Sequence, residues 1–165
     1  MVGKMRRRWT AGLGMAVVGA VLASLVVGGA VGMAQQPVGE AAKRKTRNFT
    51  ERASLHLVKK RGAILREAGT ATGTLPGTVK ARFDTSNITN VKATVTFYPY
   101  SGGSLTFNAT GHPESTGTIA KFSGYLGVRK GTGRYAEALG SGTFTGTVNR
   151  NTWAFTVNAN ATLTY

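Results

Sequence analysis

Cysteine is absent from the 165-residue chain. Disulfide bonds, thiol catalysis and cysteine metal sites are therefore excluded, and burial and hydrogen bonding have to hold the fold. Histidine is nearly absent too, since only His56 and His112 occur, far apart in the sequence. A histidine metal site is not expected from such spacing, and no residue pattern indicates a cofactor.

Acidic residues are also scarce, with Asp and Glu totalling 6 against 21 Lys and Arg. General acid–base catalysis needs a pair of groups held in one cleft. After residue 61 the acids are Glu67, Asp84, Glu114 and Glu137, and only Glu67 is near a predicted strand. No catalytic residue is assigned on this basis, and a function without catalysis is favoured.

The formal net charge of +15 favours anionic partners. Lipid head groups, acidic wall polymers and nucleic acid bound as a non-specific polyanion all fit this charge, whereas nothing indicates a specific nucleic-acid site. The basic residues concentrate between residues 40 and 67. We expect Lys43, Arg44, Lys45 and Arg47 either to contact an anionic membrane or cell-wall surface or to belong to a solvated spacer.

The first 34 residues have the pattern of an export signal. Basic residues occupy position 4 and positions 6–8, and residues 11–34 carry no charge. This pattern predicts a signal peptide over residues 1–34 in a secreted or cell-envelope protein of bacterial type. A retained anchor is the alternative, because 24 uncharged residues could cross a bilayer that needs ~20. Either outcome places the rest of the chain outside the cytoplasm.

Residues 35–61 have the composition of a basic, poorly ordered linker. Pro37 and Gly39 open this stretch, and apolar residues are sparse before Leu55. Such a composition is typical of chain outside a folded core. The folded domain is therefore predicted to span residues 62–165.

From residue 62 onward, apolar and polar residues alternate with a period of two. The clearest run extends from Trp153 to Tyr165. Clusters of turn-forming residues separate the runs, and no 3.6-residue period is sustained, so antiparallel hairpins are expected. Without a helix to cover a sheet, closure into a small barrel best removes exposed edges; a β-sandwich is the alternative. The predicted fold is an all-β antiparallel meander closed into a barrel of about eight strands, preceded by the hydrophobic leader helix and the basic linker.

The predicted barrel interior is apolar. Its side chains either fill the centre or leave a slot for one small hydrophobic ligand; a filled interior is the simpler expectation, since stability alone requires these residues inside. The candidate ligand contacts are Phe97, Phe107 and Phe155 inside, Tyr98 at a strand end, where an ordinary turn is the alternative, and Tyr135 across an opening. The predicted interior residues are Val79, Phe83, Val95, Phe97, Leu105, Phe107, Phe144, Phe155, Val157 and Leu163.

Residues 131–136 (GTGRYA) fit the dinucleotide pattern G-x-G-x-x-A. In a nucleotide site this pattern closes a strand and opens a helix. Here further glycines and then a strand follow at once, so the segment is predicted to be a barrel connection in which Gly131 and Gly133 reverse the chain at positive φ. Arg134 and Glu137 are expected to form a surface ion pair.

The longer segment over residues 128–146 (VRKGTGRYAEALGSGTFTG) resembles a known barrel family. Its Gly-Thr-Gly, aromatic and Ala-x-Ala-x-Gly elements are similar to those of the dirigent and allene oxide cyclase type of eight-stranded barrel. Residues 69–73 (GTATG) and 77–78 (GT) look like the glycine–threonine strands of that group. The chain departs from the pattern at Lys130, where a second glycine is usual.

The resemblance implies a barrel fold, and it implies bacterial exported relatives that are mostly without assigned activity. From the residues of this chain we expect a non-enzymatic exported barrel that binds a small apolar molecule or serves as an envelope component. Plant members steer or cyclise reactive apolar intermediates inside the barrel, so the alternative is a dirigent-like or allene oxide cyclase-like isomerase or cyclase that acts on a hydrophobic intermediate. No catalytic residue can be carried over position by position.

Overall fold

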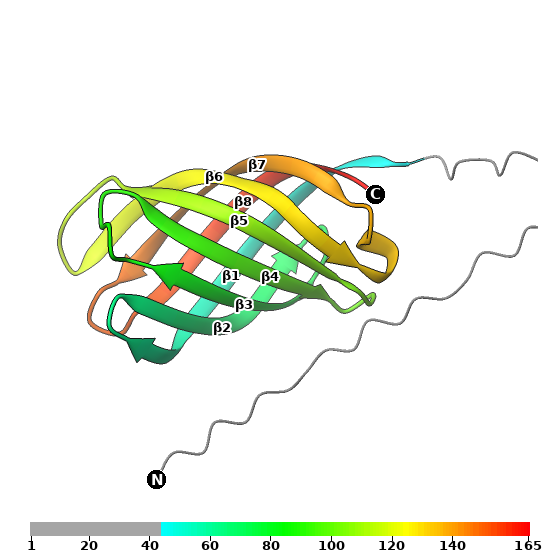
Figure 1. Cartoon of the computed structure of the whole chain (residues 1–165). Coiled ribbons are helices and arrows are strands. Elements are labelled where there is room, and N and C mark those ends of the chain that lie inside the picture. The colour runs from blue at the N-terminus through cyan, green and yellow to red at the C-terminus, as the bar shows by residue number, and fades with distance from the viewer. Residues whose placement is uncertain (1–43) are drawn as a thin grey trace, which may run out of the picture. The chain divides into compact units, whose positions relative to one another are not determined.

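The alternating residues form strands that close on themselves. The computed structural model describes residues 44–165, in which each strand pairs antiparallel with the next and the last pairs with the first (Figure 1). The predicted all-β barrel is confirmed, and the two faces of the alternative sandwich do not form. The strands are β1 (Thr46–Arg61), β2 (Ile64–Gly73), β3 (Gly77–Asp84), β4 (Val91–Pro99), β5 (Ser104–Pro113), β6 (Ile119–Thr132), β7 (Leu139–Asn149) and β8 (Ala154–Thr164).

β1 corrects the predicted linker. The strand pairs with β2 over Glu51–Arg61 and with β8 over Thr46–Leu55, so it closes the barrel. Phe49 and Leu55 on its inner face are buried. The basic residues of this strand are exposed, which explains why its composition resembles that of a linker. The domain boundary predicted at residue 62 is therefore too late.

The N-terminal predictions lie outside the described residues. These are the signal peptide over residues 1–34, the alternative anchor and the contact predicted for Lys43. Over residues 44–165 the structure contains no helix long and apolar enough to span a membrane.

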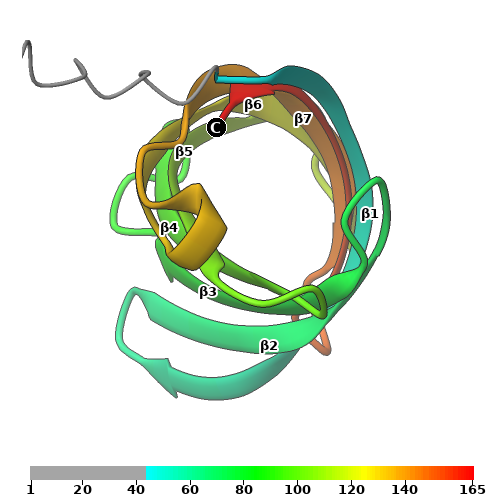
Figure 2. The ribbon, with the colours of Figure 1, turned by 90° about the vertical axis from the view of Figure 1, so that its right-hand side faces the viewer.

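The two ends of the barrel are built differently. Because consecutive strands run in opposite directions, the β1–β2, β3–β4, β5–β6 and β7–β8 loops share one end, which we call the mouth. The other end carries the β2–β3 and β4–β5 loops and the short 3₁₀-helix η1 (Gly133–Tyr135) between β6 and β7. Figure 2 views the barrel from this second end, where η1 lies at one side of the opening.

Side chains close the η1 end. Tyr135 is 0% exposed and packs edge to face on Tyr165, with ring centroids 4.9 Å apart. Leu105 and Leu163 are also fully buried. Their pairing partners, Gly131 and Gly140, lie close to η1 in the sequence. Both buried leucines therefore lie at the η1 end of the barrel. The predicted turn segment thus acts as a plug.

The two glycines of this connection have different roles. Gly133 has φ of +60°, as predicted, a conformation that glycine adopts without steric cost. Gly131 instead belongs to β6 and has no positive φ. A Cβ atom at position 131 would lie 1.7 Å from the carbonyl oxygen of Tyr135, so this glycine allows η1 to fold back against β6.

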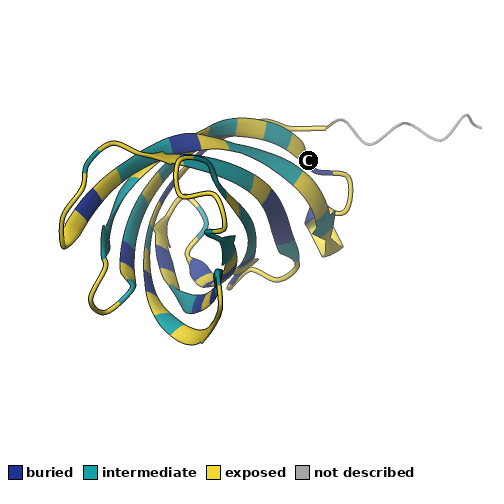
Figure 3. Ribbon diagram, turned by 60° about the vertical axis from the view of Figure 1, so that its left-hand side comes forward, coloured by how far each residue is buried: buried dark blue, intermediate teal, exposed yellow. Residues whose placement is uncertain are grey.

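Burial follows the predicted alternation along the strands (Figure 3). All ten residues predicted to face the interior belong to the core or to the wall of its cavity, which confirms the assignment of faces. Two inward-facing acids, Glu51 and Glu67, are buried among these apolar residues.

Candidate functional site: a phenylalanine-lined cavity

The barrel encloses a cavity of about 380 Å³, and all seven phenylalanines of the chain line it. This volume lies within the range of small-molecule sites. The simpler expectation of a filled interior is therefore wrong. Alanines occupy inward positions on several strands, where larger side chains would have filled the centre: they are Ala53, Ala71, Ala93, Ala109, Ala120 and Ala159.

The phenylalanines form two groups along the cavity. Phe49 contacts Phe97 and Phe107, with ring centroids 5.9 Å apart in each pair. In the second group Phe155 stacks on Phe83 at 4.7 Å and meets Phe122 at 5.7 Å. These distances are typical of favourable aromatic pairs, which hold the rings in fixed positions around the central space.

The cavity opens at the mouth, where loop residues complete its wall. Ile88 of the β3–β4 loop and Trp153 of the β7–β8 loop both line it, and Ile88 is 73% exposed. Trp153 has φ of +56°, and its backbone N–H donates to the carbonyl oxygen of Asn149 at 2.6 Å. The ammonium group of Lys60 lies 4.5 Å from the centre of the Trp153 ring. Large apolar side chains thus frame the entrance.

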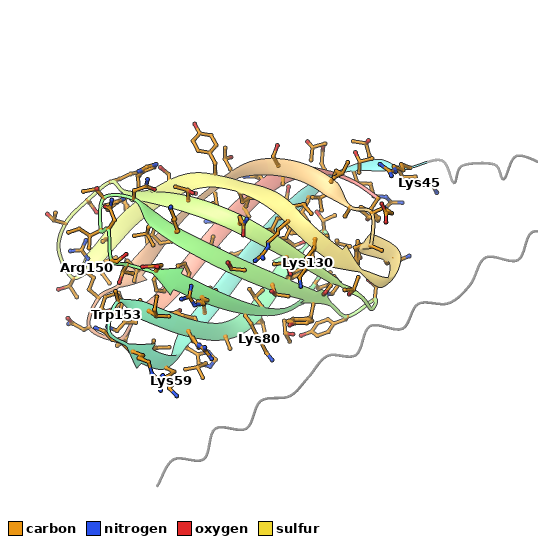
Figure 4. All side chains as sticks on the ribbon, in the orientation of Figure 1. Lys45, Lys59, Lys80, Lys130, Arg150 and Trp153 are labelled. Carbon is orange, nitrogen blue, oxygen red and sulfur yellow. The ribbon has the colours of Figure 1, made fainter. Side chains whose placement is uncertain are left out.

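Positive charge predominates around this apolar entrance, where Asp84 at the end of β3 and Glu114 in the β5–β6 loop are the acidic residues. Lys121 and Arg150 line the outer part of the cavity, and both are exposed. Lys59 and Arg150 lie at the Trp153 end of the barrel, whereas Lys45 and Lys130 lie toward the other end (Figure 4). An anionic group at the entrance would therefore be favoured electrostatically.

Glu51 places a carboxyl group inside the cavity. It is 5% exposed and pairs with Gly73 on one side and Ala159 on the other. The backbone N–H of Leu75 donates to Oε1, whereas Oε2 has no hydrogen-bond partner among the described residues. Burial raises the pKa of Glu51, and the Leu75 hydrogen bond opposes this shift. The cavity therefore contains one polar atom whose hydrogen-bonding capacity is unused.

Glu67 also faces the interior, but it does not line the cavity. It is 2% exposed and pairs with Leu57 and Ala81. Both oxygens lack a hydrogen-bond partner within residues 44–165, and burial raises the pKa of Glu67 to about 7. Glu51 pairs with Gly73 of β2, and Gly73 lies six residues from Glu67 on the same strand. At the usual rise per residue this separation is about 20 Å. The two acids are too far apart to act as a catalytic pair.

The five predicted ligand contacts divide into two sets. Phe97, Phe107 and Phe155 line the cavity. Tyr98 instead lies on the outer face, where Lys80 approaches its ring at 5.7 Å. Tyr135 is in the plug at the closed end and does not reach the cavity wall. The last two are therefore not placed to contact a ligand inside the barrel.

Sequence reasoning missed Glu51, Lys121, Arg150 and Trp153 as members of this site. A signal for Glu51 was present, since it falls between Phe49 and Ala53 in a period-two pattern with Leu55. Because residues 35–61 were predicted to be a linker, this pattern was not interpreted as a strand. The mouth residues could not be grouped because Lys121 belongs to β6 whereas Arg150 and Trp153 belong to the β7–β8 loop, and only the closed barrel shows that they lie at one end.

Predicted features outside the cavity also differ. Glu137 forms an ion pair with Arg44 at 3.8 Å, rather than the predicted pair with Arg134, whose guanidinium lies 6.0 Å from the Tyr135 ring centre. No cluster of three potential metal ligands occurs in the described part of the chain. Comparisons with family models, with curated proteins and with solved structures found no match. The site therefore has to be interpreted from its own geometry.

Proposed function

We propose that the protein is an exported barrel that binds a small apolar molecule in its cavity. One observation carries this proposal: the seven phenylalanines surround a space instead of filling it. Packing these rings together would have stabilised the fold further, because unfilled volume in a core costs stability. A ligand would recover these contacts on binding.

The mouth indicates how such a ligand is oriented. The inner wall is apolar, while Lys121 and Arg150 lie at the entrance. An apolar body in the barrel with a polar or anionic end at the mouth would satisfy both regions. The plugged end leaves the mouth as the route of entry.

A neutral fluorescent dye tests cavity binding. N-phenyl-1-naphthylamine should bind the full-length protein and accept energy from Trp153, the tryptophan on the cavity wall. Replacing the inward Ala109 in Ala109→Phe should fill part of the cavity and weaken binding at least about tenfold, the consequence of losing a few contacts in a pocket. Ala154→Phe makes the same change at an exposed position and should leave binding unchanged.

Two results would contradict the proposal. One is that the dye does not bind a folded protein. The other is equal weakening by both substitutions, which would place the dye outside the barrel. Mass spectrometry of apolar extracts of the natively purified protein would then identify a bound compound directly.

The carboxyl group of Glu51 favours a second candidate, an isomerase or cyclase acting on a hydrophobic intermediate. A carboxyl group in an apolar cavity can serve as a general acid, and this candidate also rests on the resemblance to dirigent and allene oxide cyclase barrels. If it is correct, Glu51→Gln should abolish a chemical conversion while leaving ligand affinity within a few-fold. Product analysis after incubation with the native ligand measures this, and an unchanged rate would refute the role of Glu51.

The basic N-terminal residues support a proposal for a partner surface. Arg44, Lys45 and Arg47 are exposed and precede or begin β1, and with Lys43 they would contact an anionic membrane or wall polymer. Replacing Lys43 and Lys45 by Gln should weaken salt-sensitive binding to phosphatidylglycerol vesicles. The same change at Lys59 and Lys80, away from the Lys45 end of the barrel (Figure 4), removes equal charge and should have less effect; equal losses would indicate a general charge effect.

A further inference from the structure

The cavity has a second polar region at its inner end, far from the mouth. Glu51 pairs with Ala159 of β8, which lies six residues after Trp153 in the sequence. With a tilted strand this corresponds to ~15 Å along the barrel axis. Leu75, which donates to Glu51, belongs to the β2–β3 loop at the closed end. The carboxyl group therefore lies at the inner end of the apolar space.

Only one of its oxygens is available. Oε1 accepts the Leu75 N–H, which fixes the side chain, and Oε2 is buried without a partner in residues 44–165. The backbone makes room for this oxygen, since a Cβ on the neighbouring Gly73 would lie 3.0 Å from Oε2. Burying a polar atom without a hydrogen-bond partner costs free energy. A ligand group that forms a hydrogen bond with Oε2 removes this cost, so the bond contributes more binding free energy than an ordinary hydrogen bond.

We infer that Glu51 is the inner anchor of the cavity and binds a hydroxyl group at the buried end of an otherwise apolar ligand. A hydroxyl group fits because it both donates and accepts. It can accept a hydrogen bond from a neutral carboxyl group, or donate one to a carboxylate. A carbonyl group only accepts hydrogen bonds, so it would bind only the neutral carboxyl group. A cationic amine would lose its hydration among the phenylalanines, which costs free energy. This inference rests on the proposed function.

Two fatty acids that differ at one end test the inference. Decanoate and ω-hydroxydecanoate share the anionic end for the mouth, and only the second carries a hydroxyl group at the inner end. Calorimetry on the full-length protein should show about tenfold tighter binding of ω-hydroxydecanoate, as expected for a hydrogen bond to a buried group that otherwise has none. 5-Hydroxydecanoate, with its hydroxyl group among the phenylalanines, should bind more weakly than decanoate.

Variants assign the preference to Glu51. Glu51→Gln keeps an acceptor for Leu75 and a donor for the ligand, so the preference for ω-hydroxydecanoate should persist. Glu51→Met should remove it while decanoate still binds. Glu67→Gln changes the buried carboxyl group that does not line the cavity and should leave the preference intact.

The outcomes separate the two proposals. If neither acid binds the wild-type protein, cavity binding of such ligands is wrong and the inference falls with it. If both bind equally, or if the preference survives in folded Glu51→Met, the cavity binds apolar molecules but Glu51 is not their inner anchor. The comparison of the three acids on the wild-type protein needs no variant, so a failure of Glu51→Met to fold does not block the test.

Discussion

At the scale of single residues, Glu67 should make stability depend on pH. Burial raises its pKa from 4.5 to about 7. Between these values the folded protein keeps a proton that the unfolded chain releases, so the free energy of unfolding should fall as pH rises from 4.5 to about 7 and then level off. The shift corresponds to about 3 kcal/mol at most. Urea unfolding across this pH range measures it.

Glu67→Gln should remove most of this dependence, because the amide does not titrate. Glu51 contributes a smaller fall in the same direction, since burial raises its pKa as well. Glu114→Gln provides the matched control: this exposed loop residue should leave the wild-type slope in place. If Glu67→Gln keeps the full slope, another group is responsible.

At the scale of elements, the contact between β6 and η1 depends on a glycine. Gly131→Ala would place a methyl group against the carbonyl oxygen of Tyr135. The η1 segment would then have to move away from β6 and would close this end of the barrel less well. We expect a loss of about 2 kcal/mol, typical of overpacking, together with a lower melting temperature. Gly127→Ala is the control on the same strand, since the nearest atom to its added Cβ is 4.0 Å away.

Chemical denaturation of both variants checks this prediction. Gly127→Ala should be within about 0.5 kcal/mol of the wild type, as for most substitutions without a clash. Equal losses in the two variants would mean that β6 tolerates no side chain at either glycine and that the η1 contact is not the cause. Dye binding by the folded fraction of Gly131→Ala should persist, because Gly131 does not line the cavity.

The elements also show how far the sequence could be interpreted. The alternation is visible in the segments that form β3, β4, β5 and β8, so the barrel and much of its inner face were predictable. β1 was not, because an inward Glu51 interrupts its apolar face and its outer face is basic. A sequence pattern treats a buried acid as evidence of exposure, whereas in the barrel the neighbouring strands bury it.

At the scale of the whole molecule, the cavity could not be predicted. Alternation identifies which side chains point inward, but the space left between them depends on barrel diameter and on how alanines and phenylalanines meet across it. The same seven phenylalanines fit a filled core and a lined cavity. The mouth depends on closure too, since Lys121 belongs to β6 and Arg150 to the β7–β8 loop.

Closure of the barrel brings basic residues together at the mouth, and their charge should favour anionic ligands over cationic ones. Sixteen Lys and Arg against five Asp and Glu fall within residues 44–165, and two of the five acids are buried inside. Decanoate should therefore bind more tightly than decyltrimethylammonium, and its affinity should fall with added salt, because salt screens exposed charges. Replacing Lys121 and Arg150 by Gln should weaken decanoate about five- to tenfold, as for removal of exposed charge contacts, and leave the uncharged dye unaffected.

The matched control removes equal charge at a distance. Lys45 and Lys130 lie away from the mouth (Figure 4), so replacing both by Gln should change decanoate binding less than twofold if local contacts decide. If the two double variants lose affinity equally, net charge alone attracts the ligand. If the cationic amphiphile binds as tightly as decanoate, Lys121 and Arg150 do not contact the ligand's outer end, and the cavity selects only for an apolar body.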